Sequence, residues 1–454
     1  MTKHNADFDS PEVRRTIIKL ALPMIAAQFI NLLYSIVDRM FIGHIPGVGQ
    51  TALTGVGLCF PIIQIAYAFN HLWGFNGGAP LSSIERGRGN SEEAGMIQGN
   101  SFVMLIITGV IMTAASLIFT EPILRLFGAS DVTLGYASEY LRIYSLGFTF
   151  SLVATGMNAF INSQGFSRTG MMTVVIGAAL NFALDPLFIF VFGWGVSGAA
   201  AATCISQAVS AMWVFLFLLS KKPLIRIERK HLAINGKRVR KVAVLGLSGF
   251  TMGATNSAVQ IVCNRMAFMY GGDLLVGAMT VINSVREIFS TPIGGLTSAS
   301  SPVMSYNYGA KRYDRVTRAS NFAIMVGAAF SLVFTLAVEL FPHLFVGIFT
   351  QDASLTEVTV RAMRIYFCLF LFMSLQQVAQ STFVALGKAA HAIFFSLFRK
   401  IMIVVPLTIL LPLFLGADGV VTAEPISNLV GGLASFITMK IVTGREFRSA
   451  LSSR

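Results

Sequence analysis

Long apolar segments dominate this chain and limit what it can fold into. We count twelve, and each is long enough to cross a bilayer, since a membrane-spanning helix needs about 20 mostly apolar residues. Their hydropathy is continuous rather than alternating, so we predict helices and not the strands of a membrane barrel. The expected spans are 17–43, 52–82, 94–119, 136–160, 167–192, 196–219, 242–269, 275–305, 318–341, 359–385, 389–414 and 418–442.

The composition excludes most other classes of protein. Charged residues make up 12% of the 454 residues and hydrophobic residues 54%, whereas a soluble domain has about 25% charged residues. The chain lacks the polar residues to cover a soluble fold, and we predict an all-α polytopic membrane protein. Its net charge of +13 does not indicate nucleic acid as a partner, because a nucleic-acid groove normally sits on a hydrophilic fold.

Lys and Arg gather on one side of the predicted membrane. With the ends of adjoining spans included, the side of the N-terminus holds 25 of the 34 basic residues, and the loops of the other side hold only Arg125. Cytoplasmic loops are rich in Lys and Arg. We therefore expect a multi-pass protein of the cell (plasma) membrane with both termini in the cytoplasm.

Short matches at a nearly constant spacing indicate that the chain is a duplication. The run 142–144 (Arg-Ile-Tyr) recurs at 364–366, and the glycines of 195–198 recur in 416–419. Six spans in each half is an even number, so both halves enter the membrane from the same side and the repeat is parallel, a plan typical of secondary transporters. We predict an N-lobe of helices 1–6 (1–219), a basic cytoplasmic linker (220–241) and a C-lobe of helices 7–12 (242–454).

Motifs for catalysis are absent from the sequence. The pairs Gly236-Lys237 and Gly387-Lys388 lack the Ser or Thr and the upstream glycine spacing of an ATP-binding loop. No nucleophile, paired-acid or zinc-site pattern occurs either. We therefore expect a protein that is not an enzyme and has no cofactor, and whose energy comes from a gradient of Na⁺ or H⁺.

Acidic residues inside the membrane are the candidates for ion coupling, because a carboxylate at mid-bilayer costs at least about 2.5–3.5 kcal/mol. We single out five within the predicted spans: Asp38, Asp185, Glu287, Glu339 and Glu424. Counting 1.5 Å per residue from the span ends, Asp38 lies about 8 Å deep and Asp185 about 10 Å deep. Independent helices thus place these two acids at the same level.

Two further oxygen-bearing side chains share this level. Asn181 lies one turn before Asp185 on the same helix face, and Thr203 is about 10 Å deep on the next helix. Oxygen ligands suit a hard cation such as Na⁺, and two nearby acids can instead share a proton. We predict a cation-coupling site at Asp38, Asn181, Asp185 and Thr203; the alternative is that Asn181 and Thr203 only form a polar helix contact.

The same stretches carry a family likeness. Leu22-Pro23 through Val37-Asp38 to Gly43, the run Asn181 to Pro186, and Gly195 to Ala200 resemble the MATE (multidrug and toxic compound extrusion) transporters, as does Ser305 to Ala310. The resemblance covers essentially the whole chain. It implies two six-helix bundles forming a V around a central cavity. It also implies export of organic cations and amphipathic drugs, including antibiotics, in exchange for Na⁺ or H⁺.

The resemblance also implies a cation site in the N-lobe. That site falls on Asp38, Asn181, Asp185 and Thr203, with Asn158 as a further member. Our depth count instead places Asn158 near the other end of its helix. A C-lobe cation site is not expected, because helix 7 carries Gln260, Asn264 and Arg265 where some family members have a carboxylate.

Other polar residues within spans are candidates for a substrate cavity. They are Gln28, Tyr34, Gln64, Gln260, Asn283 and Glu287. We expect small-molecule drugs and the lipid bilayer as partners, and a protein that functions as a monomer. An alternative function is a flippase of a lipid-linked saccharide, which four basic residues within spans keep open: Arg265, Arg286, Arg399 and Lys400.

Overall fold

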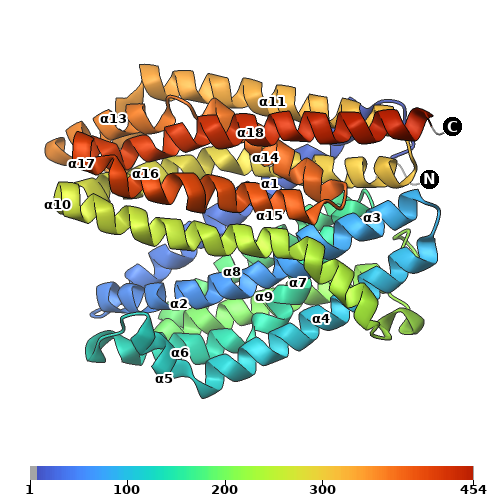
Figure 1. The fold of residues 1–454 in the computed structure, drawn as a ribbon. Coiled ribbons are helices and arrows are strands. Elements are labelled where there is room, and N and C mark those ends of the chain that lie inside the picture. Colours follow the sequence, from blue (N-terminus) through green and yellow to red (C-terminus); the bar gives the residue numbers. More distant parts are fainter. Residues whose placement is uncertain (1–7, 453–454) are drawn as a thin grey trace. The chain divides into compact units, whose positions relative to one another are not determined.

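The computed structural model describes residues 8–452, except the side chains of 257, 258 and 450–452. Those residues are helical for most of their length and include no β-strand. They form two compact units: residues 18–247 make up most of unit 1, and unit 2 contains the chain from Ser248 onward together with Pro11–Ile17. Figure 1 shows each unit as a set of long helices.

Unit 1 contains most of the first α-helix and all of the next eight. They are α1 (Val13–Gly43), α2 (Gly49–Asn70), α3 (Ala79–Gly87), α4 (Ser91–Ile118), α5 (Thr120–Leu126), α6 (Asp131–Leu146), α7 (Phe148–Ser163), α8 (Ser167–Pro186) and α9 (Gly195–Leu219). Three short helices join them: η1 (His71–Gly78), η2 (Leu187–Val191) and η3 (Arg229–Leu232). In this unit α9 packs against α6, α7 and α8, and this contact places the α8 and α9 side chains together.

Unit 2 contains most of α10 (Gly236–Gly309) and all later elements. They are α11 (Tyr313–Leu340), α12 (Pro342–Gly347), α13 (Ala353–Phe367), α14 (Leu371–Ala385), α15 (Ala389–Leu397), η4 (Phe398–Val404), α16 (Val405–Leu410), α17 (Pro412–Leu415) and α18 (Ala417–Ser452). The long α18 contacts α13, α14, α16 and η4 (Figure 1).

The described residues contain nine to eleven candidate membrane spans, and one of them, α10, is broken into two helices, which agrees with the predicted number of twelve. Nine helical segments are long and apolar enough to cross a membrane. Two more crossings are bent helix pairs, α6 with α7 at 53° and α13 with α14 at 51°. The twelfth arises because α10, 74 residues long, contains two helices that join at Gly272, where φ is 59°. The protein is therefore a multi-pass membrane protein.

Three π-helical segments interrupt the α-helices: η1, η2 and η4. Such turns are rare and often occur at functional sites. Pro186 ends α8 and η2 follows, since proline has no N–H for the helical hydrogen bond. Pro23, by contrast, lies inside the continuous α1. Two of these segments adjoin or contain the charged residues described below.

The basic segment 220–241 packs onto α4. The Asn100 amide donates to the backbone oxygens of His231 at 3.2 Å and Ala233 at 2.9 Å, and its oxygen accepts from the Asn235 N–H at 2.9 Å. Two ion pairs join the same elements: Lys230 with Glu92 at 2.9 Å and Arg238 with Glu93 at 2.8 Å. The Glu92 carboxylate raises the pKa of the Lys230 ammonium group. The segment is thus held by specific side chains.

Candidate functional site

A buried polar cluster on α8 and α9 brings three of the predicted site residues together. Asp185 is 0% exposed, and Asn181 and Thr203 are each 1% exposed. The Asn181 Nδ2 donates to Asp185 Oδ1 at 3.1 Å and to Thr203 Oγ1 at 3.3 Å. One amide therefore links the carboxylate of α8 to the hydroxyl of α9, as the predicted shared depth requires.

The fourth residue of the cluster, Asp38, comes from α1. Its carboxyl group interacts with that of Asp185. The Oδ1 of Asp38 and the Oδ2 of Asp185 are shielded from solvent, and neither accepts a hydrogen bond from a described residue. Two adjacent carboxyl groups with unbonded buried oxygens are unfavourable unless a proton or a cation lies between them.

Tyrosine side chains surround the acid pair. The Tyr34 hydroxyl interacts with Thr203 and with both acids, and Tyr140 lies within electrostatic range of Asp38. Tyr140 stacks on Tyr144, with ring centroids 5.4 Å apart. We predicted Tyr34 only as a cavity residue and did not single out the two α6 tyrosines. Their spacing of one helical turn was the only available signal, and it is equally typical of an apolar core.

Asn158 lies outside this cluster. Its Nδ2 donates to the backbone oxygen of Gly170 at 3.1 Å. Gly170 precedes Asn181 by three turns of α8, which is about 16 Å along the axis at 1.5 Å per residue. The structure therefore does not bring Asn158 to the two acids, in agreement with the depth count and not with the site implied by family resemblance.

The six expected cavity residues divide evenly between the units. In unit 1, Gln28 and Gln64 are exposed and Tyr34 is half-buried. In unit 2, Asn283 is half-buried, Glu287 is exposed, and the Gln260 amide donates to the Asn264 oxygen at 2.8 Å. Their role in a substrate cavity stays a prediction.

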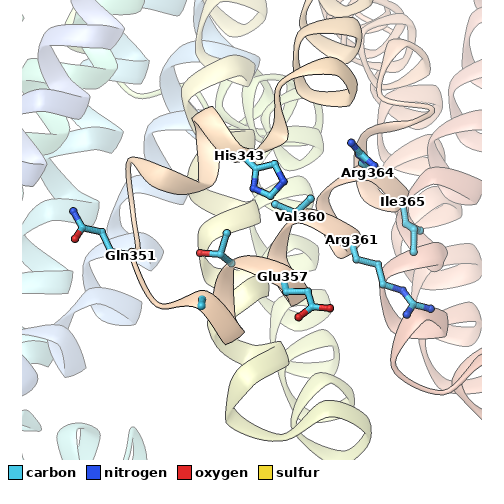
Figure 2. Close-up of a pocket in the computed structure, with 9 residues that line it drawn as sticks. His343, Gln351, Glu357, Val360, Arg361, Arg364 and Ile365 are labelled. Atoms are coloured by element: carbon cyan, nitrogen blue, oxygen red, sulfur yellow. The ribbon is translucent and has the colours of Figure 1, made fainter.

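Pockets at α12 and α13, and at α5 and α6, contain none of the predicted site residues. The first has a volume of about 740 Å³, and Figure 2 shows the His343, Glu357, Arg361 and Arg364 side chains around it. The second has about 490 Å³ and includes Glu121, Gly135, Glu139 and Arg142. These four residues lie 222 positions before His343, Glu357, Arg361 and Arg364 of the first pocket, in that order. The Arg-Ile-Tyr runs are separated by the same 222 residues. The two pockets therefore reflect the internal duplication.

Glu424, one of the five intramembrane acids, has a cationic partner in the structure. The Arg399 Nη1 donates to Glu424 Oε1 at 2.8 Å and to the Asn428 Oδ1 at 2.8 Å. The sequence indicates both charged residues but not that they pair. Glu424 is therefore an ion-pair partner within unit 2.

Comparison with known proteins identifies the family. The sequence model of the MatE family matches residues 23–187 and 250–410. The chain belongs to the MATE family. The model matches once in each half of the chain, as expected of a duplication, and the predicted all-α architecture with twelve spans in two bundles is confirmed.

Relatives of this MATE protein match over nearly its whole length. The multidrug export protein MepA of Staphylococcus aureus (strain MRSA252) is 22% identical over 438 residues and covers 96% of each chain, as is the MepA of Staphylococcus saprophyticus. Among solved structures, a MOP superfamily transporter from Pyrococcus furiosus has a TM-score of 0.91 at 22% identity, covering 98% of this chain and 99% of its own. A MATE crystal structure in the bent conformation has a TM-score of 0.90 at 22% identity, covering 96% and 97%. These structures share the fold.

Proposed function

We propose that this protein is a secondary active multidrug exporter that exchanges organic cations and amphipathic drugs for Na⁺ or H⁺. The observation that carries the proposal is the set Asp38, Asn181, Asp185 and Thr203, in which each acid has one buried oxygen without a hydrogen-bond partner among the described residues. The multidrug export proteins among its relatives support the same substrate class.

The acid pair suits either coupling ion for a physical reason. A proton shared between Asp38 and Asp185 removes one of two adjacent negative charges. A Na⁺ ion would be held by the carboxylates together with the oxygens of Asn181 and Thr203, the ligand type that hard cations prefer. Either ion changes the balance of charge between α1 and α8, and it favours whichever conformation binds it more tightly.

The transport cycle follows alternating access. Drug enters from the cytoplasm or the inner leaflet, and an external cation then reaches Asp38 and Asp185. Ion binding favours a rearrangement that releases the drug outside. Pro186 and the π-helical η2 follow Asp185 directly, so the helix is interrupted where such a rearrangement would begin.

The proposal also includes the oligomeric state, the location and the cofactor requirement of the protein. It functions as a monomer in the plasma membrane with both termini in the cytoplasm, and it needs no cofactor besides the coupling ion. The relatives are drug exporters and do not favour the lipid-linked saccharide flippase, which we do not propose.

Ethidium efflux from proteoliposomes tests this function. We expect wild-type protein to drive efflux under an imposed Na⁺ gradient or an imposed H⁺ gradient. Asp38→Asn and Asp185→Asn should each abolish gradient-driven efflux while keeping the wild-type unfolding temperature. Glu357→Gln, at an exposed acid of α13, is the matched control and should transport normally. Wild-type rates in both aspartate variants would overturn the proposal.

A further inference from the structure

A second buried cluster of charged residues lies within unit 2, where η4 packs against α18. In Figure 1, η4 is the segment between α15 and α16. Arg399 and Lys400 are consecutive residues of η4 and are only 6% and 7% exposed. Asn428 of α18 is 0% exposed, and the Glu424 side chain is 12% exposed. Four polar or charged side chains are thus withdrawn from solvent at one helix contact.

The hydrogen bonds within this cluster leave several donors unused. Arg399 uses its Nη1 for both Glu424 and Asn428. The Nε of Arg399 and the Nδ2 of Asn428 are buried and have no acceptor among the described residues. The side-chain amine of Lys400 has no ion pair or hydrogen bond to another described residue. The unused groups are all donors, so the missing partner is an acceptor.

The charges of the cluster are unequal as well. Arg286, Lys400 and Arg399 all interact electrostatically with Glu424. The other acid acting on Arg286 is its neighbour Glu287, which is exposed. Three basic side chains therefore share the single carboxylate of Glu424. A buried charge without a counter-charge is strongly unfavourable, and a bound anion would supply that counter-charge.

The internal duplication relates the sequence around this cluster to the part of unit 1 that contains the acid cluster. The spacing of 221 residues that relates Gly195 to Gly416 also relates Thr203 to Glu424. In unit 1 the helix before Thr203 carries the acceptor Asp185, whereas in unit 2 the segment before Glu424 carries the donors Arg399 and Lys400. At this spacing Arg399 and Lys400 correspond to Ala178 and Ala179 rather than to Asp185. The two clusters nevertheless differ in polarity: the first lacks a cation or proton, and the second lacks an anion.

We propose that the unit 2 cluster is a binding site for a monovalent anion. The ligand is either a free halide or the carboxylate of an amphipathic substrate, held by the Arg399 Nε–H, the Asn428 amide and the Lys400 ammonium group. Charge-assisted bonds from such donors are the strong kind of hydrogen bond. The site is independent of the cation-coupling site proposed for unit 1.

Thermal unfolding of the purified full-length protein tests the site with bromide as the probe. A ligand that binds the folded state alone raises the unfolding temperature in a saturable way. We expect bromide to stabilise the wild type, and gluconate at equal ionic strength to leave it unchanged. Lys400→Gln should raise the half-saturating bromide concentration at least about tenfold, the loss expected for one charged hydrogen bond. Lys241→Gln, at an exposed lysine of α10, is the matched control and should behave as wild type.

Two further measurements keep the proposal falsifiable if Lys400→Gln folds poorly. Asn428→Leu removes one neutral donor and should weaken bromide binding in the same direction. A bromide-soaked crystal should show anomalous scattering beside Arg399 and Asn428. Equal unfolding temperatures in bromide and gluconate, or wild-type bromide affinity in both variants, would overturn the proposal and indicate that Lys400 is neutral.

Competition distinguishes the two sources of the anion. Carboxylate-bearing tetramethylrhodamine and its methyl ester serve as fluorescent probes. If the substrate carboxylate occupies the site, bromide should displace the acid but not the ester; a free-halide site leaves both probes unaffected while bromide still stabilises the protein. Asp38→Asn should keep the bromide response, so a failure of the coupling proposal remains separable from a failure of this one.

Discussion

Neutralising one partner of the Arg399–Glu424 ion pair should destabilise unit 2 strongly. Glu424→Gln preserves the shape of the side chain but leaves the Arg399 guanidinium buried beside two other basic side chains, Arg286 and Lys400. The paired atoms are 2.8 Å apart, and the side chains are 7% and 12% exposed. Two unit charges about 4 Å apart interact by about 4 kcal/mol at an effective dielectric constant of about 20. Removing one partner of a buried pair typically costs about 3–5 kcal/mol, and we expect a loss in that range.

Thermal unfolding in detergent, followed by circular dichroism, measures this loss. For a unit of about 200 residues, each kcal/mol shifts the midpoint by about 2–4 °C, so the expected decrease is about 6–20 °C. Adding Arg399→Met to Glu424→Gln removes both charges and should recover much of the stability, because no uncompensated guanidinium remains. Glu357→Gln, at an exposed acid, should leave the midpoint unchanged. The reasoning is refuted if Glu424→Gln unfolds at the wild-type temperature, or if the double variant is less stable than the single one.

Three other substitutions test the remaining contacts. Asn181→Leu removes the amide that bridges the unit 1 cluster and should stop gradient-driven efflux by folded protein; unchanged efflux would argue against a coupling role. Asn100→Leu removes three hydrogen bonds between α4 and the segment 220–241. Trypsin should therefore cleave this segment faster than in the wild type. An unaltered cleavage rate would show that these bonds do not hold the segment. Gly246→Ala would place a methyl group 1.9 Å from the Leu72 backbone oxygen, so we expect a loss of about 1–3 kcal/mol by overpacking, and a wild-type unfolding midpoint would contradict the close approach.

Span lengths and residue depths were predictable, because they depend only on the order and number of residues along the chain. The length of apolar runs gave all twelve spans, including the two bent pairs and the two halves of α10. Counting residues from the span ends also placed Asp38, Asp185 and Thr203 at one level, since the rise per residue of a helix is constant. The same count placed Asn158 near the other end of its helix, and its contact to Gly170 agrees with that position.

Features that depend on helix rotation and on lateral neighbours were not predictable. Nothing in the sequence indicates that Arg399 meets Glu424, because both lie within apolar spans whose interacting faces follow only from packing. Tyr140 and Tyr144 were missed for the same reason. The segment 220–241 is predicted only as a basic cytoplasmic linker, and only the structure shows the buried bonds from Asn100 that hold it to α4.

The sequence by itself thus determined the class of the protein, its number of crossings, its duplication and the depth of its acids. These properties follow from hydropathy, charge and residue count, which act along the chain. The tertiary structure decided which groups meet at each depth: two acids with unbonded oxygens in unit 1, and a surplus of basic and amide donors in unit 2. The physical reason is that an intramembrane charge is stabilised by its nearest neighbours, and those neighbours come from other helices.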